Sequence, residues 1–112
     1  MKDTLVAVNR EGMGSADPAL QKKLIGTYLK LLAGNGSLPG AIALYADGVK
    51  LACEGSEVVP QLAELESKGV HVILCRTCLD HFGLAEKVKV GVIGGMGDIL
   101  AAQATAAKVV TL

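Results

Sequence analysis

Two cysteines at the end of an apolar run are the clearest chemical feature of this sequence. Cys75 and Cys78 are separated by Arg76 and Thr77. A thiol becomes a nucleophile or a metal ligand when it ionises, and the start of a helix or a nearby cation favours ionisation. We therefore expect Cys75 to end a strand and Cys78 to enter the next helix as the thiol of lower pKa. Arg76 would stabilise the Cys78 thiolate, and Cys75 would act as its resolving partner.

Packing is the ordinary alternative for any cysteine, because a buried thiol behaves as a small hydrophobic side chain. We favour this interpretation for the third cysteine, Cys53, which follows an apolar strand, although it could reach the other two. His81 lies three residues after Cys78, about one helical turn away, so it is a candidate proton donor for thiol chemistry.

Metal, haem and thioredoxin-like sites fit the pattern less well. A zinc site would use the pair and His81, with His71 or Cys53 as a fourth ligand, but the second ligand pair of a strong zinc signature is missing. Haem attachment needs a histidine directly after the second cysteine, where Leu79 stands. A thioredoxin-like protein would carry its pair earlier and a proline later, and no proline follows this pair. We expect no metal and no cofactor.

Three glycine-containing turns are further candidates for binding. The loop "NREGMGSAD" lacks the third glycine of a dinucleotide-binding fingerprint, and "GVIGGMGD" lacks a Walker lysine, although its amides could hold an anion. The ordinary alternative for both is a tight turn between a strand and a helix. We expect Met13 and Met96 to form an apolar rim over the cysteines, and the ordinary alternative is that each methionine belongs to the core. Together with the two methionines, we expect Arg76, Thr77, Gly14, Gly48 and Gly95 to be binding residues.

The predicted secondary structure puts these turns at one edge of a sheet. Strand-forming segments lie in Thr4–Asn9, Gly40–Cys53 (with a turn at Asp47-Gly48), Val70–Cys75, Val88–Gly95 and Lys108–Leu112. Helices are expected after an Asp17 N-cap, over Ser56–Lys68, over Leu79–Lys87 and over Asp98–Ala107. The apolar spacing of the first helix comes from Leu20, Leu24, Tyr28, Leu31 and Leu32. This alternation predicts an α/β fold, a three-layer α/β/α domain with a five-stranded, mainly parallel sheet. Ligands bind outside the carboxyl ends of such strands, where the cysteines lie.

Composition narrows the functional class. The 112 residues are most simply one domain, residues 1–112. Eleven basic and eleven acidic residues cancel, and only 3% are aromatic, so we expect no nucleic-acid partner. No apolar run is long enough to span a membrane, and the start does not resemble an export signal. With three cysteines, this favours a cytoplasmic protein with reduced thiols. The 51% hydrophobic content favours a homo-oligomer.

Taken together, the segments resemble the DsrE-like superfamily. The resemblance rests on Gly48-Val49-Lys50-Leu51, "LAELESKGV", Cys75-x-Thr77-Cys78-Leu79 and the later "FGL" and Val90-Gly91. It is closest to the C-terminal domain of YedF-type, sulfurtransferase-like proteins of selenium metabolism. It implies a compact, often oligomeric α/β/α domain in which a cysteine at a strand end relays sulfur.

The sequence departs from that family in several places. Arg76 stands where the family usually has glycine between the cysteines. Gly95 precedes Met96 where asparagine is frequent, and Ala46 and Asp47 stand where an asparagine commonly precedes the Gly-Val-Lys-Leu stretch. YedF-type proteins also carry an N-terminal domain with a Cys-Pro motif, which this chain lacks, so a separate sulfur-carrier protein is the expected donor or acceptor.

Two functional hypotheses follow. In the first, the protein handles sulfur or selenium and carries a persulfide-type group on a cysteine of the C-x-x-C turn, as a sulfurtransferase or a sulfur-relay protein. In the second, it is a non-catalytic oligomeric module that binds a small anion, a thiol compound or a partner protein.

Overall fold

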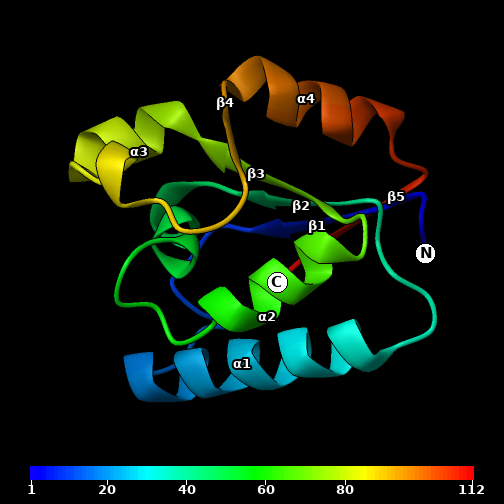
Figure 1. The fold of residues 1–112 in the computed structure, drawn as a ribbon, viewed down its shortest axis with the longest axis horizontal. Helices are drawn as coiled ribbons and strands as arrows, with labels where there is room; N and C mark the ends of the chain where they lie inside the picture. The colour runs from blue at the N-terminus through cyan, green and yellow to red at the C-terminus, as the bar shows by residue number, and fades with distance from the viewer.

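The computed structural model describes residues 1–112 as one α/β domain built on a parallel sheet (Figure 1). The sheet has five strands in the order β4-β3-β2-β1-β5, and each neighbouring pair is parallel. The strands are β1 (Thr4–Val8), β2 (Ala41–Leu44), β3 (His71–Cys75), β4 (Val92–Gly94) and β5 (Lys108–Thr111). The predicted five-stranded sheet and alternating order are confirmed.

Four α-helices and two short 3-10 helices connect the strands. The helices are α1 (Pro18–Gly34), η1 (Ala46–Ala52), α2 (Val59–Ser67), α3 (Arg76–Phe82), η2 (Ala85–Lys87) and α4 (Met96–Thr105). Figure 1 shows α1 and α2 on one side of the sheet and α3 and α4 on the other, which gives the expected three layers. None of these helices combines the length and apolar character that a bilayer-spanning segment needs.

The central strands form the core. Every residue of β1 is buried, as are four of the five in β3, so these strands are apolar on both faces, as a covered parallel sheet requires. The register sets Val8 of β1 beside Leu44 of β2, and Cys75 of β3 beside Gly94 of β4. The carboxyl ends of neighbouring strands therefore meet at one edge.

Helix α1 begins as predicted and buries only part of the apolar set that predicted it. The Asp17 side chain accepts a hydrogen bond from the amide of Leu20 at 3.0 Å, and Pro18 occupies the first turn. The buried residues are Ile25, Leu29, Leu32 and Ala33. Leu20, Leu24 and Leu31 are instead exposed, and Tyr28 is partly buried. Of the five residues whose spacing predicted the helix, Leu32 is thus buried and Tyr28 packs against the core, whereas the other three face outward. The helix carries apolar residues on more than one face, and packing against the sheet decides which leucines are covered.

The segment after β2 is a 3-10 helix and not the predicted strand extension to Cys53. Helix η1 folds back because Gly48 packs directly against the backbone carbonyl of Val8, where any side chain would clash. The amide of Gly48 also bonds the carbonyl of Tyr45 at 2.9 Å. Cys53 makes only an isolated antiparallel bridge, to Val88.

The structure also moves the third helix and shortens the fourth strand. Helix α3 starts directly after β3 and ends at Gly83, which is left-handed at φ 68° and supplies the usual glycine C-cap. The expected helix over Leu79–Lys87 is therefore split, and its second part is η2. Strand β4 starts only after Gly91, which at φ 89° packs against Val72 and Leu74 of β3.

Candidate functional site: a thiol pair at the sheet edge

Cys75 and Cys78 lie where β3 passes into α3 without a loop. Cys75 is the last residue of β3 and the N-cap of α3, and it is fully buried. Cys78 is the third residue of α3 and is partly exposed. Both thiols are free. The pair is therefore asymmetric, because only Cys78 can be approached from solvent without local opening.

The sulfur of Cys78 accepts a hydrogen bond from the backbone amide of Ala46, at 3.1 Å. Ala46 is the only residue other than glycine with a positive φ, at 50°. Left-handed backbone is unfavourable for alanine, and strain of this kind is retained where the surrounding structure over-determines it. The chain after β2 therefore adopts a left-handed conformation at Ala46, and in this conformation the Ala46 N–H group points at the Cys78 sulfur.

The predicted low pKa of Cys78 is wrong. Burial raises the pKa of the Cys78 thiol above its ordinary value, the Ala46 hydrogen bond opposes this, and both Cys75 and Asp47 raise it further. Desolvation and a nearby carboxylate disfavour the thiolate. The thiol form therefore predominates at neutral pH, and thiolate chemistry needs a basic partner or a change at this edge.

Arg76 does not act as the expected counter-ion. It lies two positions before Cys78 in α3, and residues so spaced point to different sides of a helix. Its guanidinium lies 3.9 Å from the carboxylate of Asp80, and both side chains are 59% exposed. Thr77 is exposed and makes no side-chain hydrogen bond. The polar residues between the cysteines thus face solvent.

A second charged pair borders the thiols. The Lys50 ammonium lies 2.8 Å from a carboxylate oxygen of Asp47, and Lys50 also lies over the Phe82 ring, 4.3 Å from its centroid. This contact ties η1 to the last turn of α3. The His81 ring packs edge-on against Phe82, with centroids 5.2 Å apart, and makes no hydrogen bond to Cys78. Its role as a proton donor stays a prediction.

The loop containing Met13 and Gly14 is tied to α1. The Gly14 carbonyl accepts hydrogen bonds from Arg10 at 2.7 Å and from the Gln21 side chain at 2.9 Å. The Met13 amide bonds the Gln21 carbonyl, and its side chain packs against the core. These contacts explain the loop as structure, and none of them reaches α3.

Gly48, Gly95 and Met96 follow the carboxyl ends of β2 and β4, at the same edge of the sheet as the thiols. Gly48 belongs to η1, whose first residue contacts Cys78. Gly95 follows Gly94, which is paired with Cys75, and its amide bonds the Asp98 side chain at 2.8 Å. Asp98 thus caps α4 from inside its first turn. Met96 is the first residue of α4 and is 54% exposed, so about half of its side chain is open to solvent.

The remaining titratable groups do not assemble a metal site. No three His, Cys, Asp or Glu side chains converge as they would around one ion. Cys53 is 1% exposed and its thiol donates to the carbonyl of Val49 at 3.2 Å. Burial raises the pKa of Cys53 above its ordinary value. Cys53 is therefore part of the core.

A family comparison fits this geometry. A model of the DsrE/DsrF-like family matches residues 13–112. The chain belongs to the DsrE/DsrF-like family. The match includes the thiol pair, η1 and all strands but the first. No functionally curated protein matches the sequence.

Solved structures share the fold of this chain. The E. coli ychN protein is 21% identical, with a TM-score of 0.70 over 97% of this chain and 98% of its own. Protein MTH1491 of unknown function, from Methanobacterium thermoautotrophicum, is also 21% identical, with a TM-score of 0.69 over 97% of each chain. BT1422 from Bacteroides thetaiotaomicron, also of unknown function, is 18% identical at a TM-score of 0.68, over 98% and 95%. The narrower likeness to YedF-type proteins stays a prediction.

The structure adds three residues that the sequence analysis did not single out as site residues: Ala46, Asp47 and Lys50. They belong to η1, 25 or more positions before the cysteines. One feature of the sequence could have indicated this position. Asparagine is common in the resembling family just before Gly-Val-Lys-Leu, and asparagine tolerates the left-handed conformation that Ala46 adopts. In this member of the DsrE/DsrF-like family, alanine adopts it instead.

Proposed function

We propose that this protein relays sulfur, carrying it as a persulfide on Cys78. The observation that supports this most is the partly exposed Cys78 sulfur, which a strained backbone amide from Ala46 contacts at 3.1 Å. An amide aimed at a sulfur stabilises negative charge there, as it does at other developing anions. Family membership makes sulfur chemistry the appropriate class to test.

The proposed loading step is a thiol–persulfide exchange. The Cys78 thiolate attacks the outer sulfur of a donor persulfide, the donor's S–S bond breaks, and the donor leaves as a thiolate. The proton released from the Cys78 thiol is balanced by the proton that the departing donor thiolate takes up. The product is a persulfide on Cys78, and an acceptor thiolate unloads it by the same attack in the other direction. No electrons are gained or lost overall. The donor or acceptor would be a separate sulfur-carrier protein, and a selenium donor would follow the same course.

Cys75 provides a second route by which sulfur can leave Cys78. Its thiolate can attack the inner sulfur of the Cys78 persulfide, which forms a Cys75–Cys78 disulfide and releases hydrosulfide. A dithiol reductant is then needed to restore both thiols. Because Cys75 is fully buried, we expect this step to be slower than unloading to an acceptor.

Intact-mass analysis after incubation with a persulfide donor tests the proposal. The wild type should gain the mass of one sulfur atom, and Cys78→Ser should gain none. Cys53→Ser is the matched control and should load normally. Loading that survives in Cys78→Ser and disappears in Cys75→Ser would assign the role to the other cysteine. No loading of the wild type at any pH would reject the relay.

The second candidate function, binding without turnover, is favoured by the raised pKa of Cys78. A thiol that stays protonated at neutral pH suits a binding role. Titration with a disulfide reagent in native buffer separates the two functions. If neither Cys75 nor Cys78 reacts before unfolding, the binding function is supported and the relay is rejected.

We also propose that copies of this chain assemble. Nine large apolar side chains are exposed, and Leu31 at 70% and Leu100 at 64% are the most exposed of them. The set is Met1, Leu20, Leu24, Leu31, Phe82, Val92, Met96, Leu100 and Val109. Scattered singly such residues are normal, but Leu20, Leu24 and Leu31 share one helix. Light scattering on the eluting protein should give a multiple of 11.5 kDa, and a monomer mass would contradict assembly.

A further inference from the structure

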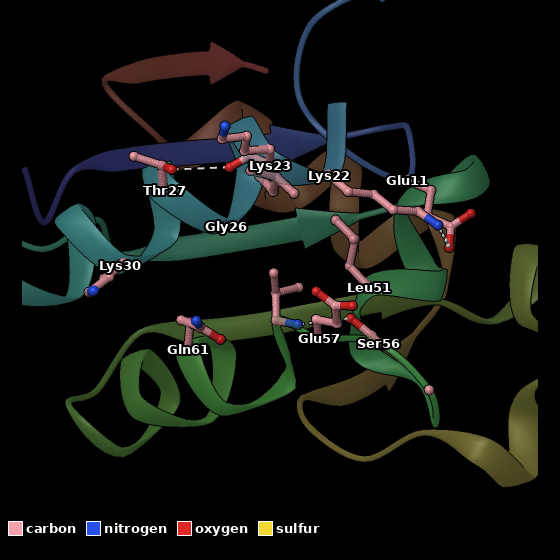
Figure 2. A pocket seen from close by; sticks show the side chains of 13 residues that line it. Glu11, Lys22, Lys23, Gly26, Thr27, Lys30, Leu51, Ser56, Glu57 and Gln61 are labelled. Atoms are coloured by element: carbon pink, nitrogen blue, oxygen red, sulfur yellow. Dashed lines mark hydrogen bonds and ion pairs between the residues drawn. The ribbon is translucent and has the colours of Figure 1, made fainter. Parts of the chain in front are cut away.

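A cavity between α1 and α2 lies apart from the thiol pair (Figure 2). Its volume is about 350 Å³, within the range of small-molecule sites. Its apolar floor consists of Ile25, Leu51 and Val58, all nearly or fully buried. The thiols contribute nothing to its lining. The relay proposed above therefore leaves this cavity without a role.

One wall of the cavity carries hydrogen-bond donors, and the facing wall carries acceptors. Helix α1 contributes cations, and Figure 2 shows Lys22 and Lys30 toward opposite ends of this wall. The facing wall contributes acceptors, the Glu57 carboxylate and the Gln61 carboxamide. Lys22 pairs with Glu11 at 3.8 Å, whereas Lys23, Lys30 and Glu57 have no ion pair. Two cations of α1 and one carboxylate of the facing wall are thus available to a ligand.

Gln61 gives the most specific indication that the cavity holds a ligand. Its side-chain oxygen is buried and has no hydrogen-bond partner, and it is the only such side-chain atom in the protein. A buried polar atom without a partner is costly, and such an atom in a cavity wall is explained by a missing partner. A ligand that donates an N–H or O–H group there would satisfy it.

Gly26 keeps the α1 wall open. It lies inside α1, where glycine weakens a helix relative to alanine. An added methyl group would meet only Val58, at 3.9 Å, which is an ordinary contact. Packing therefore does not require glycine here. A larger side chain at this position, however, would project between the helices and fill the cavity that Gly26 lines.

We propose that this cavity binds an aliphatic α-amino acid. The carboxylate would pair with Lys30, the ammonium would donate to Gln61 and Glu57, and the aliphatic side chain would cover Ile25, Leu51 and Val58. A ligand with only one of the two charges would leave one wall unpaired. The site is distinct from the thiol pair, since neither Cys75 nor Cys78 lines the cavity.

A ligand series with one carbon skeleton tests the proposal on the full chain by amide chemical-shift titration. L-leucine should give saturable shifts in α1 around Gly26 and in residues 55–61. Leucinamide lacks the carboxylate and 4-methylpentanoate lacks the ammonium, so each should bind at least about tenfold more weakly. Equal shifts with all three compounds, or no saturation with L-leucine by about 10 mM, would overturn the proposal.

Variants separate a ligand contact from a structural role. Gln61→Leu removes the unpaired oxygen, so it should raise the midpoint of thermal unfolding while weakening L-leucine binding by about tenfold. Gln103→Leu, at an exposed position of α4, is the matched control and should change binding little. Lys30→Gln should weaken L-leucine but not leucinamide, and Lys108→Gln should weaken neither. Unchanged L-leucine affinity in both Gln61→Leu and Lys30→Gln would reject the site.

Discussion

The backbone amide of Ala46 donates a hydrogen bond to the Cys78 sulfur across 32 positions of sequence. Ala46 follows β2, and Cys78 lies in α3 after β3, so two neighbouring strands bring them together. The contact requires Ala46 to adopt a φ of 50°, the only positive φ outside glycine. The reactive Cys78 sulfur thus lies beside the strained backbone of Ala46, and strained backbone is frequent at functional sites.

Ala46→Gly should stabilise the protein. Left-handed backbone costs an L-residue about 1–2 kcal/mol, and glycine escapes this cost but loses more entropy on folding, so we expect a net gain of up to about 1 kcal/mol. Urea unfolding at neutral pH measures it. Ala63→Gly, at an exposed position inside α2, is the matched control and should destabilise by about 1 kcal/mol. Loss of stability in Ala46→Gly would show that Ala46 is not strained.

Asp47→Asn should make Cys78 more reactive. The carboxylate raises the pKa of Cys78, and its removal lowers that pKa by less than about one unit because Asp47 is exposed and paired with Lys50. The rate of alkylation by iodoacetamide, measured against pH in a Cys53→Ser background, should rise at lower pH than in the parent. Asp80→Asn, a charge change on the solvent side of α3, should leave the profile in place. A shift of equal size in both variants would contradict a local effect.

Folding stability should fall as the solution becomes alkaline. The pKa values of Cys53 and Cys78 are raised in the folded state, so the folded protein holds protons that the unfolded chain releases. Their contribution is complete below the unfolded thiol pKa of about 8.5 and is lost as pH rises through the folded values. Urea midpoints on either side of this range measure the loss. Cys78→Ser should flatten the slope, and an unchanged slope in both Cys53→Ser and Cys78→Ser would contradict the assignment.

Arg76→Gln should leave the Cys78 pH profile nearly unchanged. The guanidinium is exposed, points toward Asp80 and occupies a different side of α3 from the sulfur. We expect a change in alkylation rate of less than about twofold, which is under half a kcal/mol. Asp47→Asn serves as the positive control, because it is expected to shift the same profile. Ala46→Pro is unsuitable for this purpose, because proline cannot adopt the positive φ of Ala46. A large drop in Arg76→Gln would restore Arg76 as the counter-ion of the thiolate.

The sequence determined much of the scaffold through local signals. Apolar strands alternating with helical patterns predict the parallel sheet, and the Asp17-Pro18 start of α1 follows from backbone capping alone. The position of Cys75 at a strand end also follows from a pattern within a few residues. These features were predictable because each depends on neighbours in sequence.

Tertiary structure decided which groups face one another. The sheet selects Ile25 and Leu29 over Leu24 and Leu31 as the buried side of α1. Close packing of Gly48 on Val8 turns a predicted strand extension into η1, and this turn brings Ala46 and Asp47 to Cys78. Burial then raises the pKa of Cys78, whereas the sequence pattern alone predicted a lowered value. Burial and long-range contacts depend on how the whole chain packs, so no local pattern of residues could determine the chemistry of the thiol.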